Sequence, residues 1–513
     1  MKKLLKFALS RTFLFAVLFL LQLGLFLFLT FQFTRLGTFA YLLLTVGSTL
    51  AITMAMERSG INPAYKIMWI LITVALPASG PFFYLLWGKR TIVPKRAADF
   101  LQIERRAAAA TAPDAEAGTT VLRRFPGLAR MVDYLATHAA APVYGGTACR
   151  YFAMGEDFFP VFLQRLEAAQ QFIFLEYFII KPGAMWDAIL AVLQRKAAEG
   201  VDVRLIYDGF GSLFSLPGGY DEQLREMGIQ CRVFSPLALS WHLADYKMLN
   251  HRDHRKVAVI DGQVGFTGGL NFADEYINQV QRFGVWKDTA AMLEGPGVYP
   301  LTVLFLKMWD FVAGCETDYR NYRPAPACPE GDGFVQPYSE SPLDDENVAE
   351  NAYFCLIQSA RRYVYLTTPY LILDNEMVTA LCLASKSGVD VRIITPGIPD
   401  KWYVYLVTQS FYPQLLAAGV RIYEYTPGFL HAKMYVCDDE AAIVGSANMD
   451  YRSLYLHFEN CVAFYGGHMV RDVKADFAAT MAQSREVTLE DTRRTPFYKW
   501  LGQVFLRFFA PLM

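Results

Sequence analysis

The chain carries one short phrase twice. Residues 254–261 read His-Arg-Lys-Val-Ala-Val-Ile-Asp, and residues 431–438 read His-Ala-Lys-Met-Tyr-Val-Cys-Asp. Each copy is followed at the same distance by a glycine-containing turn that ends in asparagine, at 268–271 and 445–448. Each copy therefore offers an imidazole, an ammonium group and a carboxamide at matching spacing. Two such copies suggest one site assembled from two halves.

The repeat extends to the segments around the phrase and predicts an α/β fold. Short apolar runs at 171–178 and 362–370 each lead into a helical segment and then into Gly-Val-Asp-Val-Arg, at 200–204 and 388–392. Short β-rich runs that alternate with helical segments are typical of α/β proteins, and self-similarity over this length indicates a duplicated unit.

The duplication and the composition predict the domain boundaries. We expect one half at 141–323 and the other at 348–496, separated by a Pro/Gly/acid-rich linker at 324–347. A further linker is expected at 97–140, because this stretch contains an Ala-rich run that resembles low-complexity sequence.

The first 96 residues predict a membrane anchor. Two almost unbroken apolar runs, 12–33 and 36–56, each reach the roughly 20 residues that a bilayer-spanning helix needs. A third run, 67–87, contains Pro77 and Pro81, and proline inside a helix removes a hydrogen bond and clashes with the preceding turn. Basic residues flank both ends of the anchor, and both clusters favour the cytoplasmic side. We expect two spans plus a re-entrant or interfacial third segment.

The charge distribution argues against a nucleic-acid enzyme. Residues 1–96 hold eleven of the 48 basic residues and one of the 49 acidic residues, so the rest of the chain is acidic. Proteins that bind nucleic acid normally carry a basic surface. The eight cysteines are scattered without a Cys-x-x-Cys pair, which predicts buried reduced thiols and no zinc site.

The repeated phrase predicts phosphoryl chemistry without a metal ion. On a strand, His254 and Lys256 share one face, as do His431 and Lys433, whereas the aspartates point to the opposite face. An ammonium group beside an imidazole repels a divalent cation and attracts a phosphate. The aspartates, Asp261 and Asp438, are expected to fix the strand end and its turn, and the asparagines, Asn271 and Asn448, to donate to phosphate oxygens.

A nucleophilic imidazole needs a carboxylate that fixes its tautomer. Each half offers an acid further along the chain. Asp288 follows His254 by 34 residues, and Glu459 follows His431 by 28, so we assign these as the orienting carboxylates. The other histidines (His138, His242, His251, His457 and His468) are predicted bystanders. Glu176 is a possible pocket residue, and Asp450 with Arg452 a possible ion pair.

The repeated motifs resemble the phospholipase D superfamily and, within it, the bacterial cardiolipin synthases. The resemblance covers nearly the whole chain and includes residues 62–69, 77–88, 250–256, 265–276 and 430–453. It implies two α/β/α sandwich halves that pack with pseudo-two-fold symmetry and are preceded in the chain by N-terminal transmembrane helices. It also implies a catalytic set made of the two histidines, the two lysines and the two aspartates of the motifs.

The resemblance further implies a two-step phosphatidyl transfer between two phosphatidylglycerol molecules, without cofactor or metal. His254 would be the nucleophile and His431 the general acid and then base, although near-symmetry leaves the roles exchangeable. It places the protein in the bacterial plasma membrane as a multi-pass protein, with the catalytic part on the cytoplasmic side and homo-oligomers possible. Residues 497–513, rich in aromatics, are expected at the membrane interface.

Other functions share the motif. A related phosphatidyltransferase or a hydrolytic phospholipase D with a different acceptor is the main alternative. A nuclease is disfavoured by the anchor and the acidic catalytic part, and a lipid-binding scaffold by the complete His/Lys/Asn sets in both halves.

Overall fold

A computed structural model describes residues 20–24, 27–28, 36–57, 62–88, 94–111, 114–236, 250–324, 331–344 and 346–513. These residues form two compact units, one made mainly of residues up to Arg96 and the other of the chain from Ala97 onward. The apolar-aromatic segment 237–249 and most of the first apolar run lie outside the described residues.

The N-terminal unit contains one helix that could span a membrane. Helix α3 (Leu36–Glu57) includes Thr38–Glu57, the one segment among the described residues that is long and apolar enough to cross a bilayer. Many of its apolar side chains are exposed, including Phe39, Leu42 and Leu50. The multi-span anchor expected from the sequence is therefore matched by one candidate helix in the part of the chain that the structure describes.

The third apolar run is broken, as its prolines predict. Helix α4 (Pro63–Ala75) ends before the Pro77 segment, and helix α5 (Gly80–Trp87) begins after it. Backbone N–H groups exposed by the break are satisfied from another helix, because the Gln22 side-chain oxygen accepts from Ala78 N at 3.0 Å and Ser79 N at 3.3 Å. A buried glutamine thus compensates the interruption, as the cost of an unpaired peptide group in apolar surroundings requires.

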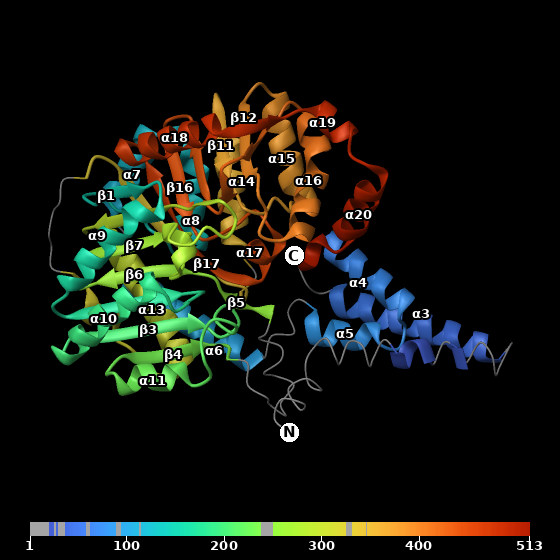
Figure 1. The fold of residues 1–513 in the computed structure, drawn as a ribbon, viewed down its shortest axis with the longest axis horizontal. Helices are drawn as coiled ribbons and strands as arrows, with labels where there is room; N and C mark the ends of the chain where they lie inside the picture. The colour runs from blue at the N-terminus through green and yellow to red at the C-terminus, as the bar shows by residue number, and fades with distance from the viewer. Residues whose placement is uncertain are drawn as a thin grey trace. The chain divides into compact units, whose positions relative to one another are not determined.

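The first half of the larger unit is a seven-stranded sheet in the order β1-β9-β7-β6-β2-β3-β4, with helices on both faces (Figure 1). Side chains of β2 alternate between the two layers. Phe174 stacks on Phe305 of helix α13 at 4.7 Å, whereas Ile173 and Leu175 join the core formed with helices α9 and α10. The elements are β1 (Ala148–Phe152), α9 (Gly155–Glu167), β2 (Phe172–Tyr177), α10 (Ala184–Ala198), β3 (Asp202–Asp208), α11 (Tyr220–Glu226), β4 (Gln230–Phe234), β6 (Lys256–Ile260), β7 (Val264–Gly268), β9 (Ala290–Glu294) and α13 (Val298–Ala313).

The second half repeats this sheet in the order β10-β17-β16-β15-β11-β12-β13, with β18 added at the edge. Every strand of the first sheet has a counterpart at the same place, so the predicted duplication is present in the fold. The elements are β10 (Phe334–Glu340), α14 (Val348–Ser359), β11 (Tyr363–Thr367), α15 (Asn375–Lys386), β12 (Asp390–Pro396), α16 (Trp402–Ala417), β13 (Arg421–Tyr425), β15 (Met434–Cys437), β16 (Ala441–Gly445), α17 (Tyr451–Tyr455), β17 (His457–Tyr465), α18 (Gly467–Ala482), β18 (Ser484–Val487), α19 (Leu489–Arg493) and α20 (Phe497–Phe508).

The two predicted linkers are wrong. Residues 97–140 form helices α6 (Pro94–Ala110), α7 (Ala115–Arg124) and α8 (Ala129–His138), and α7 and α8 contribute Val121 and Leu135 to the core of the second half. Alanine is the strongest helix former, so an Ala-rich stretch also suits a closely packed helix. Within 324–347, strand β10 pairs with β17 along its whole length, so the second sheet begins before residue 348.

The aspartate of each repeated phrase stabilises a turn. Asp261 has φ of +51° and accepts from the backbone N–H groups of Gln170, Gln171 and Phe172 at 2.7–2.9 Å. Asp438 has φ of +53° and accepts from Arg361, Arg362 and Tyr363 in the same way, at 2.7–2.9 Å. Each carboxylate therefore caps the entry to the central strand, β2 or β11. The two aspartates therefore stabilise turns, as strand alternation predicts, and a catalytic role for them stays a prediction.

Replacing Asp261 by alanine should destabilise the first half. The substitution leaves three strand-entry N–H groups without their charged acceptor, so we expect the free energy of unfolding to fall by about 2–4 kcal/mol. Denaturant unfolding of the detergent-solubilised chain measures the change. Glu226→Ala, which removes an exposed acid at the end of α11, should change stability by less than about 0.5 kcal/mol. Equal stability of the two variants would contradict this role.

Candidate active site

Two short ladders connect the halves beside the repeated phrases. Strand β5 (Arg252–Asp253) pairs with the start of β17, and β14 (Gly428–Leu430) pairs with β8 (Val285–Lys287). The residue that follows β5 is His254, and the residue that follows β14 is His431. His254 N donates to Phe458 O at 3.0 Å, and His431 N donates to Lys287 O at 2.7 Å. The two contacts are reciprocal, as a two-fold relation between the halves requires.

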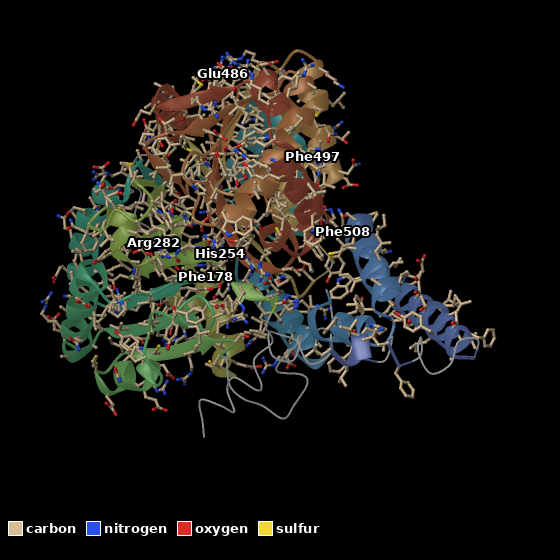
Figure 2. The ribbon with its side chains drawn as sticks, turned by 45° about the vertical axis from the view of Figure 1, so that its right-hand side comes forward. Phe178, His254, Arg282, Glu486, Phe497 and Phe508 are labelled. Carbon is tan, nitrogen blue, oxygen red and sulfur yellow. The ribbon has the colours of Figure 1, made fainter. Side chains whose placement is uncertain are left out.

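Each histidine is paired with a carboxylate from the opposite half. His254 Nδ1 lies 2.9 and 3.0 Å from the two carboxylate oxygens of Glu459, and His431 Nδ1 lies 2.6 Å from Asp288 Oδ2. The sequence offsets, which relate each acid to the histidine of its own half, therefore give the wrong pairing. Each acid lies just beyond the cross-half ladder, and so it faces the other half's histidine. Figure 2 places His254 at the junction of the two halves.

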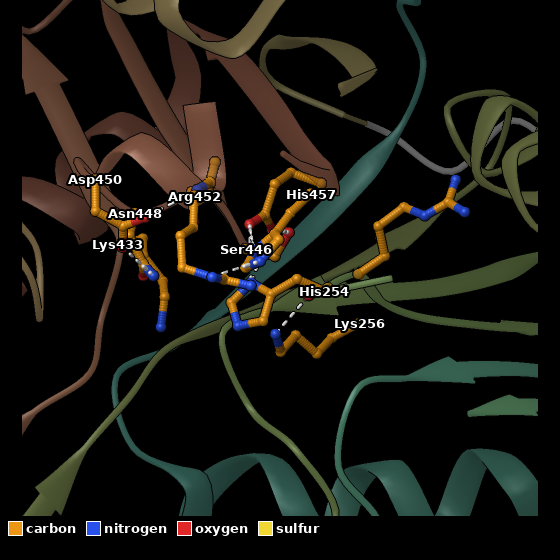
Figure 3. Close-up of polar contacts among 12 residues, drawn as sticks. His254, Lys256, Lys433, Ser446, Asn448, Asp450, Arg452 and His457 are labelled. Carbon is orange, nitrogen blue, oxygen red and sulfur yellow. Dashed lines mark hydrogen bonds and ion pairs between the residues drawn. The ribbon is translucent and has the colours of Figure 1, made fainter. Parts of the chain in front are cut away.

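The two lysines lie buried beside the histidines. Lys433 Nζ is 2.8 Å from His431 Nδ1 and 3.1 Å from Nε2, and Lys256 Nζ donates to the His254 carbonyl (Figure 3). Burial lowers the pKa of Lys256 to about 7 and that of Lys433 to about 8. Two ammonium groups withdrawn from water are a strong attraction for an anionic phosphodiester, which would restore their usual pKa.

The surroundings of the two histidines favour their neutral forms. Burial, followed by the charges of Lys256 and Lys433, lowers the pKa of both His254 and His431 well below the usual range. His431 is also among the groups that lower the pKa of His254. With Nδ1–H directed at a carboxylate, the neutral tautomer leaves the lone pair on Nε2, which is the form that a nucleophile needs. Burial raises the pKa of Asp288 to about 6.

The two asparagines are held by their own halves. Asn271 accepts from Ile179 N at 3.0 Å and donates to the Tyr276 hydroxyl at 2.6 Å. Asn448 donates to Asp450 at 3.0 Å, and its oxygen has no hydrogen-bond partner in the described part of the chain. Each amide keeps a second N–H for another acceptor, so phosphate binding by these residues stays a prediction.

The two histidines differ first in the aromatic ring that packs beside each of them. Because Phe458 and Lys287 accept the equivalent backbone bonds, the residues before them, His457 and Trp286, are counterparts. The His457 ring lies 5.6 Å from His254, and the Trp286 ring lies 5.5 Å from His431. His431 therefore packs beside an indole and His254 beside a second imidazole.

The carboxylates differ as well. The Ser446 hydroxyl donates to Glu459, but its counterpart beside Asp288 is Gly269. A Cβ at Gly269 would lie 2.1 Å from Asp288 Oδ1, so no side chain fits there. Asp288 instead accepts from Thr289 N at 2.8 Å. Gly269 lets the backbone approach the shorter side chain of Asp288, whereas the Ser446 hydroxyl donates to the longer side chain of Glu459.

His457 and Ser446 are the residues that sequence reasoning missed. His457 lies 3.6 Å from Glu459 and accepts from Arg452 Nε at 3.3 Å, and burial lowers its pKa to about 3. The signal was available, because His457 precedes Glu459 by two residues and therefore shares its face of a strand. The structure therefore places this predicted bystander beside the pair formed by His254 and Glu459.

The remaining predicted candidates have structural contacts. Glu176 is fully buried and forms an ion pair with Arg255 at 2.6 Å, away from the repeated phrase's imidazole. His251 Nδ1 lies 3.2 Å from Leu456 O, and His468 bridges Asp332 and the Cys149 carbonyl. Asp450 caps helix α17. Cysteines 149, 231, 315, 355, 382, 437 and 461 are all free.

One group of side chains has the composition of a metal site. His254, His457 and Glu459 offer ligand atoms that lie within 4.8 Å of one another. Two positively charged side chains, Lys256 and Arg452, contact the same histidines. Their charge opposes a divalent cation, and the donor set fits a phosphate site better than a metal centre.

A double-mutant cycle should reveal the crossed pairing. Removing Glu459 leaves His254 without its buried acceptor, so His254→Ala and Glu459→Ala should be non-additive in stability by about 1–3 kcal/mol. His254→Ala and Asp288→Ala, the pair suggested by sequence order, should be additive within about 0.5 kcal/mol. Unfolding of the single and double variants in detergent measures both couplings. Stronger coupling to Asp288 would overturn the assignment.

Comparison with known proteins agrees with this site. The family described as "Cardiolipin synthase, PLD-like domain" matches residues 162–293 and 353–481, one match in each half. An uncharacterised protein of Streptococcus mutans is 42% identical over 87% of this chain and 96% of its own length. A cardiolipin synthase of a Geobacillus species is 34% identical over 97% of this chain and 99% of its own.

A solved structure has the same fold. The crystal structure of a phosphatidylserine synthase from Haemophilus influenzae superposes with a TM-score of 0.55 at 12% identity, covering 71% of this chain and 95% of that one. Family match, near-full-length relatives and duplicated fold together show that the chain belongs to the cardiolipin synthase family of phospholipase D-like proteins.

Proposed function

We propose that this protein is a cardiolipin synthase that transfers a phosphatidyl group from one phosphatidylglycerol to another. The observation that carries the proposal is the pair of buried histidines, each oriented by a carboxylate from the opposite half and each beside a lysine. This arrangement provides one nucleophile, one proton donor and a positive environment around a single phosphodiester.

In the first step, His254 Nε2 attacks phosphorus and the bond from phosphorus to the glycerol oxygen breaks. His431 gives its proton to the departing oxygen, so free glycerol leaves and a phosphatidyl-histidine remains. Glu459 faces the Nδ1–H of His254 and stabilises the positive charge that the ring gains on phosphorylation. The bound anionic phosphodiester offsets the lysine charges, which restores a pKa at which His431 carries a proton.

In the second step, the terminal hydroxyl of a second phosphatidylglycerol attacks the same phosphorus. His431, now neutral, takes the hydroxyl proton, and the bond from phosphorus to His254 breaks. The products are cardiolipin and the free enzyme. The phosphodiester's free energy is retained in the phosphohistidine, so no nucleotide is required. By the near-symmetry of the two pairs, the two histidines could exchange roles.

The setting proposed for this chemistry is the bacterial plasma membrane. Helix α3 and the other apolar segments of residues 1–96 form the anchor, and the catalytic unit lies on the cytoplasmic side. Helix α20 supports membrane contact, because its outward face carries exposed apolar side chains, from Phe497 and Tyr498 to Phe505 (Figure 2). Its inner face packs on α16, where Arg507 donates to Ser410 O at 3.0 Å.

Product analysis separates this proposal from its main alternative. The full-length protein in vesicles of labelled phosphatidylglycerol, without CTP or CDP-lipid, should yield cardiolipin and free glycerol, identified by mass spectrometry. Phosphatidic acid as the main product would indicate a hydrolase. His254→Ala and His431→Ala should each lower turnover at least about 1,000-fold, since either change removes a step of the reaction. Substantial turnover in either variant would contradict a shared site.

The pH dependence should report the buried lysines. Lys256 and Lys433, with pKa values of about 7 and 8, lose their charge as pH rises, so kcat/KM should fall above this range. Asp288, with a pKa of about 6, is protonated at lower pH and no longer orients His431 as an anion, so kcat/KM should also fall below it.

The matched test replaces Lys256, the lysine with the lower pKa, by arginine, which stays charged. The alkaline fall in kcat/KM should move upward by about one pH unit, because Lys433, with a pKa of about 8, then sets it, whereas Lys386→Arg at an exposed position of α15 should leave it unchanged. An unchanged alkaline limb in the Lys256 variant would show that these lysines do not control it.

A further inference from the structure

Exposed apolar side chains of the catalytic unit are concentrated on few elements. Outside helix α20, the described residues from Ala97 onward expose ten large apolar side chains, and six of them lie in two loops. These six are Phe210, Leu213, Phe214, Ile398, Trp402 and Tyr403. The tips are the most open, with Phe214 93% and Trp402 69% exposed. A single exposed aromatic needs no explanation, but such a concentration does.

The two loops occupy equivalent places in the two halves. The first, residues 209–219, follows β3, and the second, residues 397–403, follows β12 and includes the start of α16. β3 and β12 are counterparts in the two sheets, each next to the central parallel strand. Ligands of α/β sheets bind beyond the carboxyl ends of the strands, which is where both loops begin.

The first loop is tied to the surroundings of His254. Ser212 Oγ accepts from Ile180 N at 3.1 Å, and Ser215 donates to Ile180 O at 2.6 Å. This segment begins with Phe178, whose ring meets His254 edge-to-face at 4.9 Å (Figure 2). The loop that carries Phe214 therefore contacts residue 180 of a segment whose first residue, Phe178, contacts His254.

The second loop is linked to His431 through two aromatic rings, because the Tyr370 ring lies 6.4 Å from the Phe429 ring, which lies 5.7 Å from His431. The Tyr370 hydroxyl donates to Asp400 at 2.6 Å and accepts from Lys401 at 2.8 Å. Asp400 and Lys401 are among the groups that act on the pKa of His431. Trp402 follows directly, so each catalytic histidine has one aromatic-tipped loop beside it.

We propose that these two loops form an aromatic rim that enters the headgroup region of the bilayer and admits phosphatidylglycerol to the site. This inference rests on the proposed function, because it takes the lipid as substrate. The phosphodiester of such a lipid lies in the headgroup layer, whereas the imidazoles are buried in protein. The rim brings that layer to the two histidines without drawing the acyl chains through water.

The chemistry of the rim favours a membrane over a second protein copy. Tryptophan and tyrosine, present at 402 and 403, are the side chains that prefer the membrane–water interface. Each loop also has a half-exposed ammonium group beside it, since Lys181 and Lys401 are 42% and 44% exposed, and each is paired with an acid, Glu275 and Asp400. These ion pairs leave no surplus positive charge, so the preference for a membrane comes from the aromatic side chains.

The test compares two substrates of the full-length protein. Phe214→Ser and Trp402→Ser should each lower the rate on long-chain phosphatidylglycerol in vesicles by about tenfold, because each removes an apolar anchor. Both variants should keep the wild-type kcat/KM on dibutyroyl phosphatidylglycerol, which is monomeric in water. Leu383→Ser, on α15 and 63% exposed, is the matched control and should behave as wild type on both substrates.

Membrane entry is measured directly with an added fluorophore. Phe214→Trp should retain activity on vesicles, and its additional tryptophan emission should be quenched by lipids brominated near the headgroup, whereas that of Leu383→Trp should not. Loss of activity on both substrates, or no loss on vesicles, would overturn the rim. A change of oligomeric state in light scattering of the serine variants would assign the surface to a second copy. If the wild type forms cardiolipin from neither substrate, the proposed function itself fails.

Discussion

The structure depends on hydrogen bonds that cross from one half of the chain to the other. Glu459 holds His254 and Asp288 holds His431, and each bond lies beside a backbone contact between the same strands. A buried imidazole without its acceptor, or a buried carboxylate without its donor, is costly. Neither half can therefore satisfy its own polar groups, and the two must associate for either histidine to be oriented.

The same burial sets the electrostatics of the site. Burial lowers the pKa of Lys256 and of Lys433. Burial and the charges of these lysines also lower the pKa of both histidines, which favours their neutral forms. An anionic phosphodiester reverses both effects at once, because it compensates the lysines and favours a protonated imidazole. In the reaction proposed above, the substrate thus completes the protonation pattern of the two histidines.

Much of this was predictable from the repeat. Strand alternation placed the imidazoles and lysines on one face and the aspartates on the other, and the duplicated α/β pattern predicted the repeated sheet. Which carboxylate pairs with which histidine was not predictable, because the distance between two residues along the sequence does not show whether a strand of the same half or of the other half lies beside the histidine. The packed helices α7 and α8 were missed for a related reason, since their partners include residues of α14, more than two hundred positions later. His457 was missed because its position relative to Glu459 was not used.

The placement of α7 and α8 has a consequence for biogenesis. These helices leave the ribosome before any part of the first half, yet the core that receives them belongs to the second. During synthesis the apolar faces of α7 and α8 stay unburied, exposed to water or bound by a chaperone, until the whole intervening sheet has been translated. The core of the second half is therefore completed by helices that are translated before the first half, so folding of the catalytic unit does not proceed from one end of the chain to the other.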